Sequence, residues 1–325
     1  MNKFLATAAM VGSVALTAAG PGAQAKTIKI GLSMLTQNAP YYAALQAAVL
    51  KEAKVLGATV VTADANNQMM KQISDVEDML SQNIDVLIMD PKDAKGLVGA
   101  TKDAAAAHIP VIIVDSSIDP SAPVLTTIQS DNAENGRLIG DWLIGKVKGQ
   151  DLHIALLSGD QGNVVGEARR DGVIDGIVEA QLRQLGHAGL TVVGQGWGGW
   201  TQEGGVKAME DLLTAHPDIN MVLAENDSMA LGAMRAIQDA GKADKNILVF
   251  AAADGQKEAV KLIQEGKYGA TGLNDPAVIG KMATDLAVKV GNGQTPPGLA
   301  KITFTPPVAI TQANAAQYYK PDAVF

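Results

Sequence analysis

Polar side chains that can bind hydroxyl groups directly follow four apolar runs of the chain. Asp90 follows VLIM, Asp115 follows VIIV, Asn226 follows MVLAE, and Asp254 follows VFAAA. Carboxylate and carboxamide oxygens can hold several hydroxyls at once, because hydrogen bonds to ionised oxygens are short and strong. The alternative is helix capping, since an Asp or Asn after a strand commonly accepts N–H groups of the next helix. Four such positions in one chain favour a polar cleft over capping alone.

Aromatic side chains make up only 4% of the sequence, so their positions are informative. Tyr41 and Tyr42 follow the first expected strand, and Trp197 and Trp200 stand in a glycine-rich loop. A large ring in such a loop is poorly placed for core packing, whereas it can cover the apolar face of a sugar. We predict ligand contact for Trp200 and Tyr41, and for Tyr42 and Trp197 we leave packing within one lobe open as the alternative.

Sequence motifs of common enzyme mechanisms are missing from the chain. It has no Gly-x-Ser-x-Gly elbow, no Gly-Lys-Ser/Thr phosphate loop and no His-Glu-x-x-His pair. The histidines are scattered and are interpreted as structural: His108, His153, His187 and His216. We therefore predict that the protein is not an enzyme and has no catalytic residue, cofactor or metal.

Beta-branched apolar runs alternate with Ala-rich amphipathic segments along the chain, which is typical of parallel sheets covered by helices on both faces. The expected strands are Thr27–Met34, Ala58–Ala63, Asp85–Met89, Val111–Val114, Val124–Gln129, His153–Leu157, Leu190–Gly194, Met221–Ala224, Ile247–Ala252 and Gly269–Leu273. The expected helices include Tyr42–Leu56, Met69–Gln82, Ala94–Ala107, Glu134–Lys148, Gly204–Ala215 and Ser228–Ala240. The fully apolar runs VLIM and VIIV indicate strands that are buried on both faces. The sequence thus predicts an α/β fold with doubly wound parallel sheets.

The strand–helix rhythm is interrupted at three places, namely Gln129–Asn132, Leu273–Pro276 and the proline-rich segment Gly291–Pro307. The roughly 300 residues that follow residue 25 exceed the usual size of a single core, so two domains are expected. Three interruptions suggest two lobes between which the chain crosses three times. Three ordinary loops within one large sheet are the alternative.

Residues 1–25 have the composition of a secretory signal peptide. Lys3 precedes an apolar stretch from Phe4 to Ala19, and Ala23-Gln24-Ala25 supplies the small residues of a cleavage site. The apolar stretch is short for a membrane anchor, which needs roughly 20 apolar residues. We predict cleavage after Ala25 and export to the periplasm.

The charge balance of the chain argues against some binding partners, and the absence of cysteine excludes some covalent modifications. The sequence has 26 basic and 34 acidic residues, and loss of Lys3 with the signal peptide changes the net charge from −8 to −9. An acidic chain without a basic block is a poor candidate for binding nucleic acid or anionic lipid. With no cysteine, a disulfide framework and a lipid-modified N-terminal cysteine are excluded. We expect a free periplasmic monomer.

Six collinear segments carry a recognisable pattern: SMLTQNAPYYAAL (33–45), VLIMDPKDA (86–94), IPVIIVDSS (109–117), SDNAENG (130–136), LTAHPDINMVLAENDSMALGAMRAIQDAGK (213–242) and ATGLNDPAVIG (270–280). They closely resemble the ribose-binding proteins of the periplasmic type I solute-binding family. The similarity covers essentially the whole chain after the signal peptide. It implies two similar lobes joined by a three-crossing hinge, with one sugar buried between them.

On the N-terminal lobe, the resemblance assigns ligand contacts to four residues of this chain. Tyr41 and Tyr42 correspond to the family's paired aromatics. Asp90 stands where the ribose binders have asparagine, and Asp115 matches their aspartate.

On the C-terminal lobe, Trp200 matches a stacking phenylalanine, and Asn226 and Asp254 match ligands of sugar hydroxyls. Asn274 falls where the family has a glutamine beside the hinge. The hinge itself matches Gln129–Asp131 and Leu273–Asp275.

Two positions lose a cation of the family pattern. Ser116 replaces the arginine that follows the aspartate, and Glu167 aligns with a second ligand-binding arginine, although Arg169 and Arg170 follow closely. We include Ser116, Glu167 and Arg169 among the predicted ligand-binding residues. Two lost cations and the carboxylate gained at Asp90 argue against a sugar acid or sugar phosphate and against ribose itself. A neutral sugar, a linear polyol or an amino sugar fits better. A side chain at Glu167 that points to solvent is the alternative to a ligand contact there.

The resemblance implies the substrate-binding component of an ABC importer, which captures a neutral monosaccharide or sugar alcohol by hinge closure and docks onto an ABC permease in the inner membrane. The alternatives are a periplasmic sugar sensor for a chemoreceptor or kinase, and a carbohydrate-active enzyme. The implied lobes are 26–129 plus 275–303 (N-terminal) and 130–274 plus 304–325 (C-terminal). The extension Thr311–Phe325 is expected to pack on the C-terminal lobe.

Overall fold

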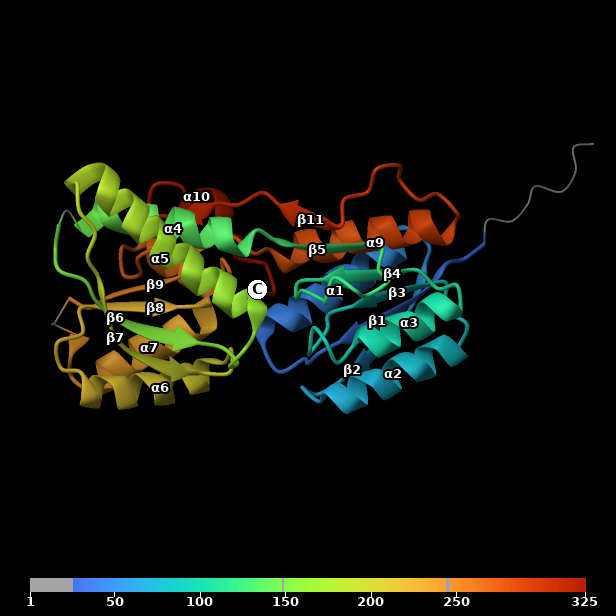
Figure 1. The fold of residues 1–325 in the computed structure, drawn as a ribbon, viewed down its shortest axis with the longest axis horizontal. Helices are drawn as coiled ribbons and strands as arrows, with labels where there is room; N and C mark the ends of the chain where they lie inside the picture. Colours follow the sequence, from blue (N-terminus) through green and yellow to red (C-terminus); the bar gives the residue numbers. More distant parts are fainter. Residues whose placement is uncertain (1–25, 148, 244–245) are drawn as a thin grey trace, which may run out of the picture.

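The computed structural model describes residues 26–147, 149–243 and 246–325. They form two α/β lobes that lie end to end along the long axis of the molecule (Figure 1). The predicted signal peptide, residues 1–25, lies outside the described residues. Among the helices that are described, none combines the length and the apolar composition that a membrane crossing requires.

The N-terminal lobe is built on a parallel sheet of six strands. Their order is β11-β5-β4-β3-β1-β2. The strands are β1 (Lys29–Met34), β2 (Thr59–Asp64), β3 (Val86–Met89), β4 (Val111–Val114), β5 (Thr126–Ser130) and β11 (Ile302–Thr305). The two apolar runs that the sequence places on doubly buried strands are β3 and β4, and every residue of both strands is buried.

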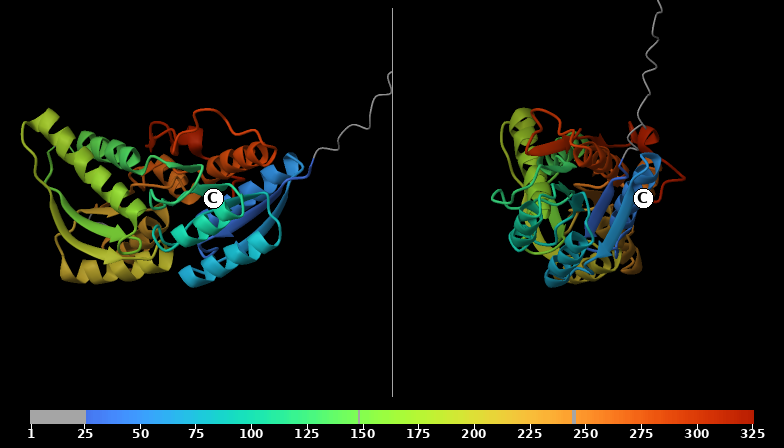
Figure 2. Two further views of the ribbon diagram at one scale, coloured as in Figure 1. Left: turned by 45° about the vertical axis from the view of Figure 1, so that its right-hand side comes forward. Right: turned by 90° about the vertical axis from the view of Figure 1, so that its right-hand side faces the viewer.

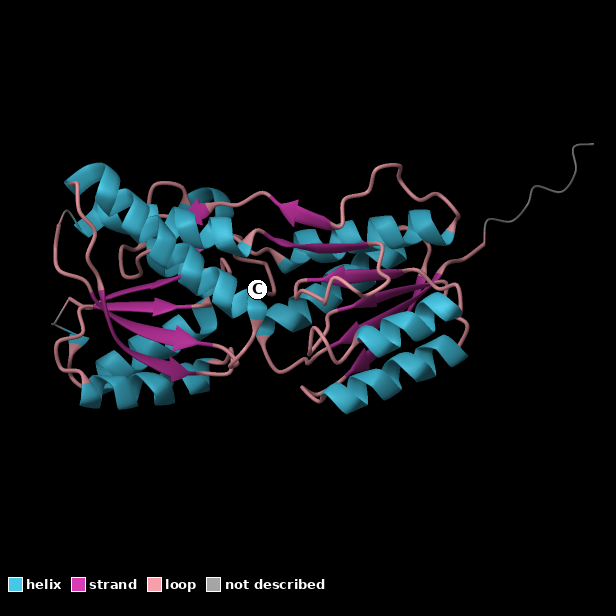
Figure 3. Cartoon of the chain, in the orientation of Figure 1, coloured by secondary structure: helices cyan, strands magenta, loops and turns pink. Residues whose placement is uncertain are grey.

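Helices cover both faces of this sheet, because successive side chains of a strand point to opposite faces. Val86 and Ile88 pack in one core with α1 (Pro40–Val55) and α9 (Pro276–Gly291). Leu87 and Met89 pack in the other core with α2 (Met69–Ser81) and α3 (Val98–Ala106). The carboxyl ends of the strands point toward the second lobe (Figure 3).

The C-terminal lobe repeats this plan with a four-stranded parallel sheet in the order β7-β6-β8-β9. The strands are β6 (His153–Ser158), β7 (Thr191–Trp197), β8 (Met221–Ala224) and β9 (Leu248–Ala251). One face packs on α4 (Asn132–Val147) and α5 (Val164–Leu185). The other packs on α6 (Gln202–Ala215), α7 (Asp227–Asp239) and α8 (Lys257–Gln264). Figure 2 shows the two lobes from further angles.

The chain passes between the lobes three times, after β5, after β10 (Thr271–Gly272) and between β11 and β12 (Ala309–Ile310). This confirms the predicted fold of two doubly wound lobes with three crossings. One buried side chain ties the crossings together: Asn135 Nδ2 donates to the Leu273 carbonyl at 2.8 Å, and Asn135 Oδ1 accepts from Val308 N–H at 2.9 Å.

Two segments differ from the expectation. The expected strand Gly269–Leu273 is reduced to β10, which pairs antiparallel with β12 instead of extending the parallel sheet. The strand β11 pairs with β5 as far as Thr305, two residues beyond the implied lobe boundary at 303. Both differences occur where the chain crosses between the lobes. There the strands with which β10 and β11 pair, and not the local apolar pattern, determine where each strand begins and ends.

The extension after β12 contacts both lobes. The short helix α10 (Ala315–Tyr318) packs with Tyr319 on the core of the C-terminal lobe, as expected. Phe325, however, packs against the core of the N-terminal lobe. The expectation that the whole extension lies on the C-terminal lobe is therefore wrong for its last residue.

Candidate ligand-binding site

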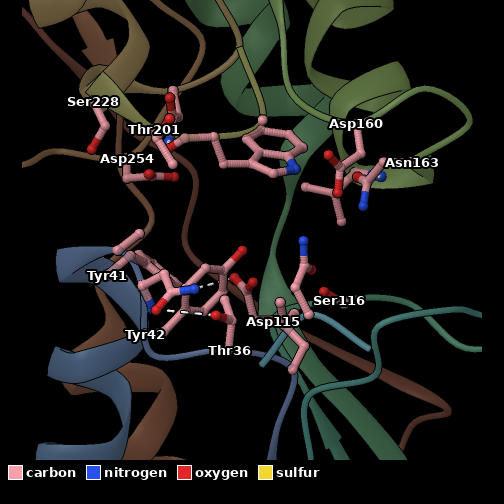
Figure 4. Close-up of a pocket in the computed structure, with 18 of the residues that line it drawn as sticks. Thr36, Tyr41, Tyr42, Asp115, Ser116, Asp160, Asn163, Thr201, Ser228 and Asp254 are labelled. Carbon is pink, nitrogen blue, oxygen red and sulfur yellow. Dashed lines mark hydrogen bonds between the residues drawn. The ribbon is translucent and has the colours of Figure 1, made fainter. Parts of the chain in front are cut away.

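A cavity of about 140 Å³ lies between the two lobes, where the strands of both sheets end. Ligands of open parallel sheets bind at this end of the strands. In Figure 4, Thr36, Tyr42 and Asp115 of the N-terminal lobe face Thr201 and Asp254 of the C-terminal lobe across open space. The volume is below the roughly 300–1,000 Å³ of pockets that hold drug-sized ligands, so it suits a small solute.

Nine of the eleven predicted site residues line this cavity: Tyr41, Tyr42, Asp115, Ser116, Arg169, Trp200, Asn226, Asp254 and Asn274. The other two are Asp90 and Glu167. Trp197, whose role was left open, ends β7 with 45% of its surface exposed and does not line the cavity.

A hydrogen-bonded chain joins the two lobes at the floor of the cavity, next to the hinge. The Tyr41 hydroxyl lies 2.5 Å from Asp115 Oδ1 and 3.2 Å from Asn274 Oδ1. The Asn274 amide donates to Asp115 Oδ1 at 3.2 Å and to Asp254 Oδ1 at 3.4 Å. Asn274 therefore bridges the acidic residue of one lobe and that of the other.

Arg169 is a buried cation whose charge is matched within the protein. Its Nη2 forms an ion pair with Asp254 Oδ1 at 2.8 Å. Its Nε donates to Asn132 Oδ1 at 2.8 Å and its Nη1 donates to the Glu225 carbonyl at 3.1 Å. Burial disfavours the charged guanidinium, but the neighbouring carboxylates of Asp254 and Asp115 outweigh this effect and raise the pKa of Arg169.

Asp254 is held in a loop that another carboxylate organises. Asp227 Oδ2 accepts the backbone N–H groups of Asp254, Gly255 and Gln256, and the Tyr268 hydroxyl donates to Asp227 Oδ1 at 2.7 Å. Burial raises the pKa of Asp254 to about 6 against the opposing effect of Arg169. Asp254 is thus mostly ionised at neutral pH and can accept ligand hydroxyls.

Asp90 is sealed beneath the cavity instead of lining it. The residue has no exposed surface, and within the described part of the chain neither carboxylate oxygen has a hydrogen-bond partner. Burial, and next the charge of Asp115, raise the pKa of Asp90 well above the ordinary carboxyl value. Asp115 follows β4 in the same way but adopts a left-handed backbone, with φ of 58°, and lines the cavity, so the position after a strand does not by itself decide whether a side chain reaches the ligand space.

Glu167 is not brought into the site and faces solvent in the first turn of α5. The helix begins at a fixed point, because the Asn163 side chain caps it by accepting the N–H groups of Val165 and Gly166. With that start, the helix turns Arg169 toward the cavity and Glu167 toward solvent.

Trp200 forms part of the wall of the C-terminal lobe. Its backbone adopts φ of 65°, a left-handed conformation that bulky residues rarely adopt unless their surroundings impose it. A Cβ on Gly159 would overlap the indole, so only glycine there permits this packing. The Arg169 guanidinium lies 5.7 Å from the centre of the Trp200 ring, within the range of a cation–π interaction.

Asn226 combines the two roles that the sequence left as alternatives. Its side-chain oxygen caps α7 by accepting Met229 N–H at 3.0 Å, and its amide donates to the Trp200 carbonyl at 3.1 Å. It also lines the cavity. The cap therefore fixes the orientation of Asn226 at the ligand space, and the second hydrogen bond stabilises the backbone turn at Trp200.

An ion pair spans the cavity wall from lobe to lobe. Lys92 Nζ, just after β3, lies 2.7 Å from Asp160 Oδ2, just after β6. Sequence reasoning missed both residues and several other polar wall residues: Thr36, Asn38, Asn67, Asn163, Thr201 and Ser228. Several of them follow the ends of β1, β2, β3 and β6, so applying the strand-end rule to every strand would have found them.

The described residues that line the cavity offer acceptors and aromatic surface, and both of their cations are compensated. Asp115 and Asp254 face the cavity, while Arg169 and Lys92 are each paired with a carboxylate of the protein. Among residues 26–147, 149–243 and 246–325, no group of three or more His, Cys, Asp or Glu side chains could hold a metal ion.

Two similar α/β lobes, three crossings and a polar cavity between the lobes define a two-lobed solute-binding protein. The chain belongs to the periplasmic binding protein family: the family model "Periplasmic binding protein domain" matches residues 30–295. It is 34% identical to the ribose import binding protein of Bacillus subtilis over 294 residues, which is 90% of this chain and 92% of that protein.

Solved structures show the same likeness. An ABC transporter solute-binding protein from Mycobacterium smegmatis with bound glycerol matches with a TM-score of 0.82 and 33% identity, covering 92% of this chain and 99% of the other. A solute-binding protein from Bacillus halodurans with bound myo-inositol matches with a TM-score of 0.80 and 27% identity, covering 91% and 98%.

Proposed function

We propose that this protein is the substrate-binding component of an ABC importer and captures a neutral monosaccharide or sugar alcohol between its lobes. The observation that carries the proposal is the pairing of Arg169 with Asp254 beside further hydrogen-bond acceptors. A ligand with many hydroxyls satisfies these acceptors. A carboxylate or phosphate would instead face the carboxylates of Asp115 and Asp254, while both cations among the described cavity residues are already paired. The similarity to a ribose import binding protein, and to solute-binding proteins solved with bound glycerol and with bound myo-inositol, supports this class.

Closure of the hinge is the proposed mechanism. Each lobe offers half of the site, so a ligand that contacts both halves favours the closed arrangement. Trp200 and the tyrosines supply apolar contact with the sugar ring or carbon chain, and the carboxylates select hydroxyl geometry. A closely similar ligand that leaves one of these buried polar groups unpaired binds more weakly, because its desolvation is not repaid.

We further propose that residues 1–25 direct export to the periplasm and are removed after Ala25, and that the closed protein then docks on its permease. The similarity to proteins named for binding and import, rather than for a reaction, supports a role without catalysis. The lobe boundaries near residues 130, 274 and 304 are part of this proposal.

Thermal unfolding of refolded, ligand-free protein tests the ligand class. The panel pairs neutral and anionic partners: D-ribose with ribose 5-phosphate, and xylitol with xylonate, alongside D-allose, L-arabinose, myo-inositol, glycerol and glucosamine. A ligand at 1,000 times its Kd should stabilise the folded state by about 4 kcal/mol. We expect stabilisation within one stereochemical group of neutral ligands. Stabilisation by an anionic member alone would contradict the proposal.

Transport is tested with the permease reconstituted in vesicles. The sugar-loaded protein should stimulate ATP hydrolysis and uptake of labelled sugar. Binding without stimulation of any permease encoded beside it would favour the sensor alternative, and chemical change of the bound sugar would favour the enzyme.

A further inference from the structure

The last seven residues, 319–325, run from one lobe to the other along the hinge, and we call this segment the strap. At its beginning, Tyr319 packs with Tyr318 against the core of the C-terminal lobe. At its end, Phe325 packs against the core of the N-terminal lobe. The end of the chain accordingly lies at the junction of the lobes (Figure 1). The strap is thus a further connection between lobes, besides the three crossings.

Polar contacts fix the strap between these two anchors. Lys257 Nζ of the C-terminal lobe donates to the Ala323 carbonyl at 2.6 Å. Lys320 Nζ lies 3.2 Å from Asp275 Oδ2, in the second crossing of the hinge. A second cavity of about 420 Å³ lies between the strap, the hinge and α1, so the strap forms one wall of a space that both lobes share.

The Phe325 ring contacts a residue of the ligand cavity. Its centre lies 5.4 Å from that of Tyr41, with an angle of 87° between the ring planes, which is a favourable edge-to-face pair. Tyr41 lines the ligand cavity, whereas Phe325 lines the second cavity. Tyr41 is therefore held at its hydroxyl by Asp115 and at its ring by the strap.

We propose that the strap limits the relative motion of the lobes and that Phe325 is a positioning residue, which fixes the Tyr41 ring for ligand binding. The second half of this proposal rests on the proposed function, but the first half does not. A ring free to turn about its side-chain torsions must be ordered when ligand binds, and this ordering lowers affinity. Packing by Phe325 removes that cost before the ligand arrives.

A ligand-free measurement tests the strap by itself. The chain has no cysteine, so Met70→Cys on α2 and Val164→Cys on α5, both exposed, can carry a pair of spin labels across the lobes. Phe325→Ala should broaden the distribution of label distances and shift it to longer values. Val324→Ala is the matched control, because Val324 is 69% exposed, and it should leave the distribution unchanged. Identical distributions for all three proteins would overturn the strap.

A double-mutant cycle with Tyr41 tests the positioning role, with D-ribose and myo-inositol as probes. Phe325→Ala should weaken binding about two- to tenfold, the range expected for loss of an aromatic pair. In a Tyr41→Leu background the same substitution should have no further effect. Phe325→Tyr, which keeps the ring, should bind as tightly as wild type. Phe325→Leu should keep the thermal stability of wild type but bind as weakly as Phe325→Ala.

The outcomes separate the two proposals. An equal loss of affinity in both Tyr41 backgrounds, or a fall in Tm with unchanged Kd, would overturn the positioning role. If no neutral member of the panel binds any variant while Phe325→Ala broadens the label distances, the restraint by the strap is supported, and the proposed ligand class and the positioning role that rests on it both fail.

Discussion

Arg169 and Asp254 form a buried ion pair, 2.8 Å from Nη2 to Oδ1, in the wall of the cavity between the lobes. An arginine in a sugar site could bind an anionic ligand, but this one is matched by a carboxylate of its own lobe. The site consequently presents acceptors to the ligand, and the pair sets both its charge and its pH dependence.

Breaking the pair from one side should destabilise the protein strongly. Arg169→Leu leaves the Asp254 carboxylate buried and unpaired, at a cost of about 3–5 kcal/mol in the free energy of unfolding. The double variant Arg169→Leu/Asp254→Leu should recover much of this loss. Urea unfolding measures both, with Arg183→Leu as control, because its pair with Asp141 is exposed and contributes less than about 1 kcal/mol. A double variant as unstable as the single one would contradict the pairing.

Trp200→Ala should weaken sugar binding by about 2 kcal/mol, roughly thirtyfold, while the protein stays folded. The physical reason is the loss of the flat apolar surface over the ligand. Gly159→Ala should act in the same direction, since a methyl group there displaces the indole. Calorimetric titration with the ligand found in the panel gives the affinities. Trp197→Ala is the control and should bind normally; unchanged affinity of Trp200→Ala would remove that ring from the site.

Ligand affinity should fall as the pH drops through about 6, the value to which burial raises the pKa of Asp254. The ionised carboxylate accepts ligand hydroxyls better than the protonated form, so ligand binding favours ionisation. Affinity should thus be constant above this pKa and decline toward tenfold per pH unit well below it. Titrations between pH 4.5 and pH 8 test this expectation. Asp254→Asn should show weaker binding without the decline, and a wild-type affinity independent of pH would refute the role of Asp254.

The stability of the protein should depend on pH through Asp90. Its pKa is raised in the folded protein, so the native state binds the proton more tightly than the unfolded chain. This contribution is present at low pH and is lost as the pH rises from the ordinary carboxyl pKa through the raised one. Asp90→Asn removes this pH-dependent contribution. The free energy of unfolding of the variant, relative to that of wild type, should therefore rise by about 1.4 kcal/mol per pH unit within that window. Urea unfolding from pH 4 to pH 8 measures this difference, and parallel curves would contradict it.

Asn135→Ala should loosen the hinge. The substitution leaves the Leu273 carbonyl and the Val308 N–H without their partner, at a cost of about 1–3 kcal/mol for each buried group. Hydrogen exchange should rise in all three crossings together, which separates this effect from a local change in α4. Asn292→Ala, at an exposed helix end, should leave exchange at the hinge unaltered. Hydrogen exchange that rises only around residue 135 would argue against the idea that Asn135 holds the three crossings together.

Much of the fold and several site residues follow from local sequence pattern. Apolar runs such as Val86–Met89 predict buried parallel strands because every side chain of such a strand meets a helix layer. The strand-end rule then places Asp115, Asn226 and Asp254 at the cavity, since parallel strands end at a common edge. These features depend on neighbours in the chain, and the sequence determined them.

Only the tertiary structure decided which groups meet. Whether Glu167 or Arg169 faces the cavity depends on where α5 begins, and the partner of Lys92 stands 68 positions away. The contact between Tyr41 and Phe325 joins nearly opposite ends of the chain. Such pairs carry no local signal, because their geometry arises only when two lobes and three crossings are packed together. The ion pairs of Arg169 with Asp254 and of Lys92 with Asp160 determine which charges a ligand meets, so only the folded structure reveals the charge of the site.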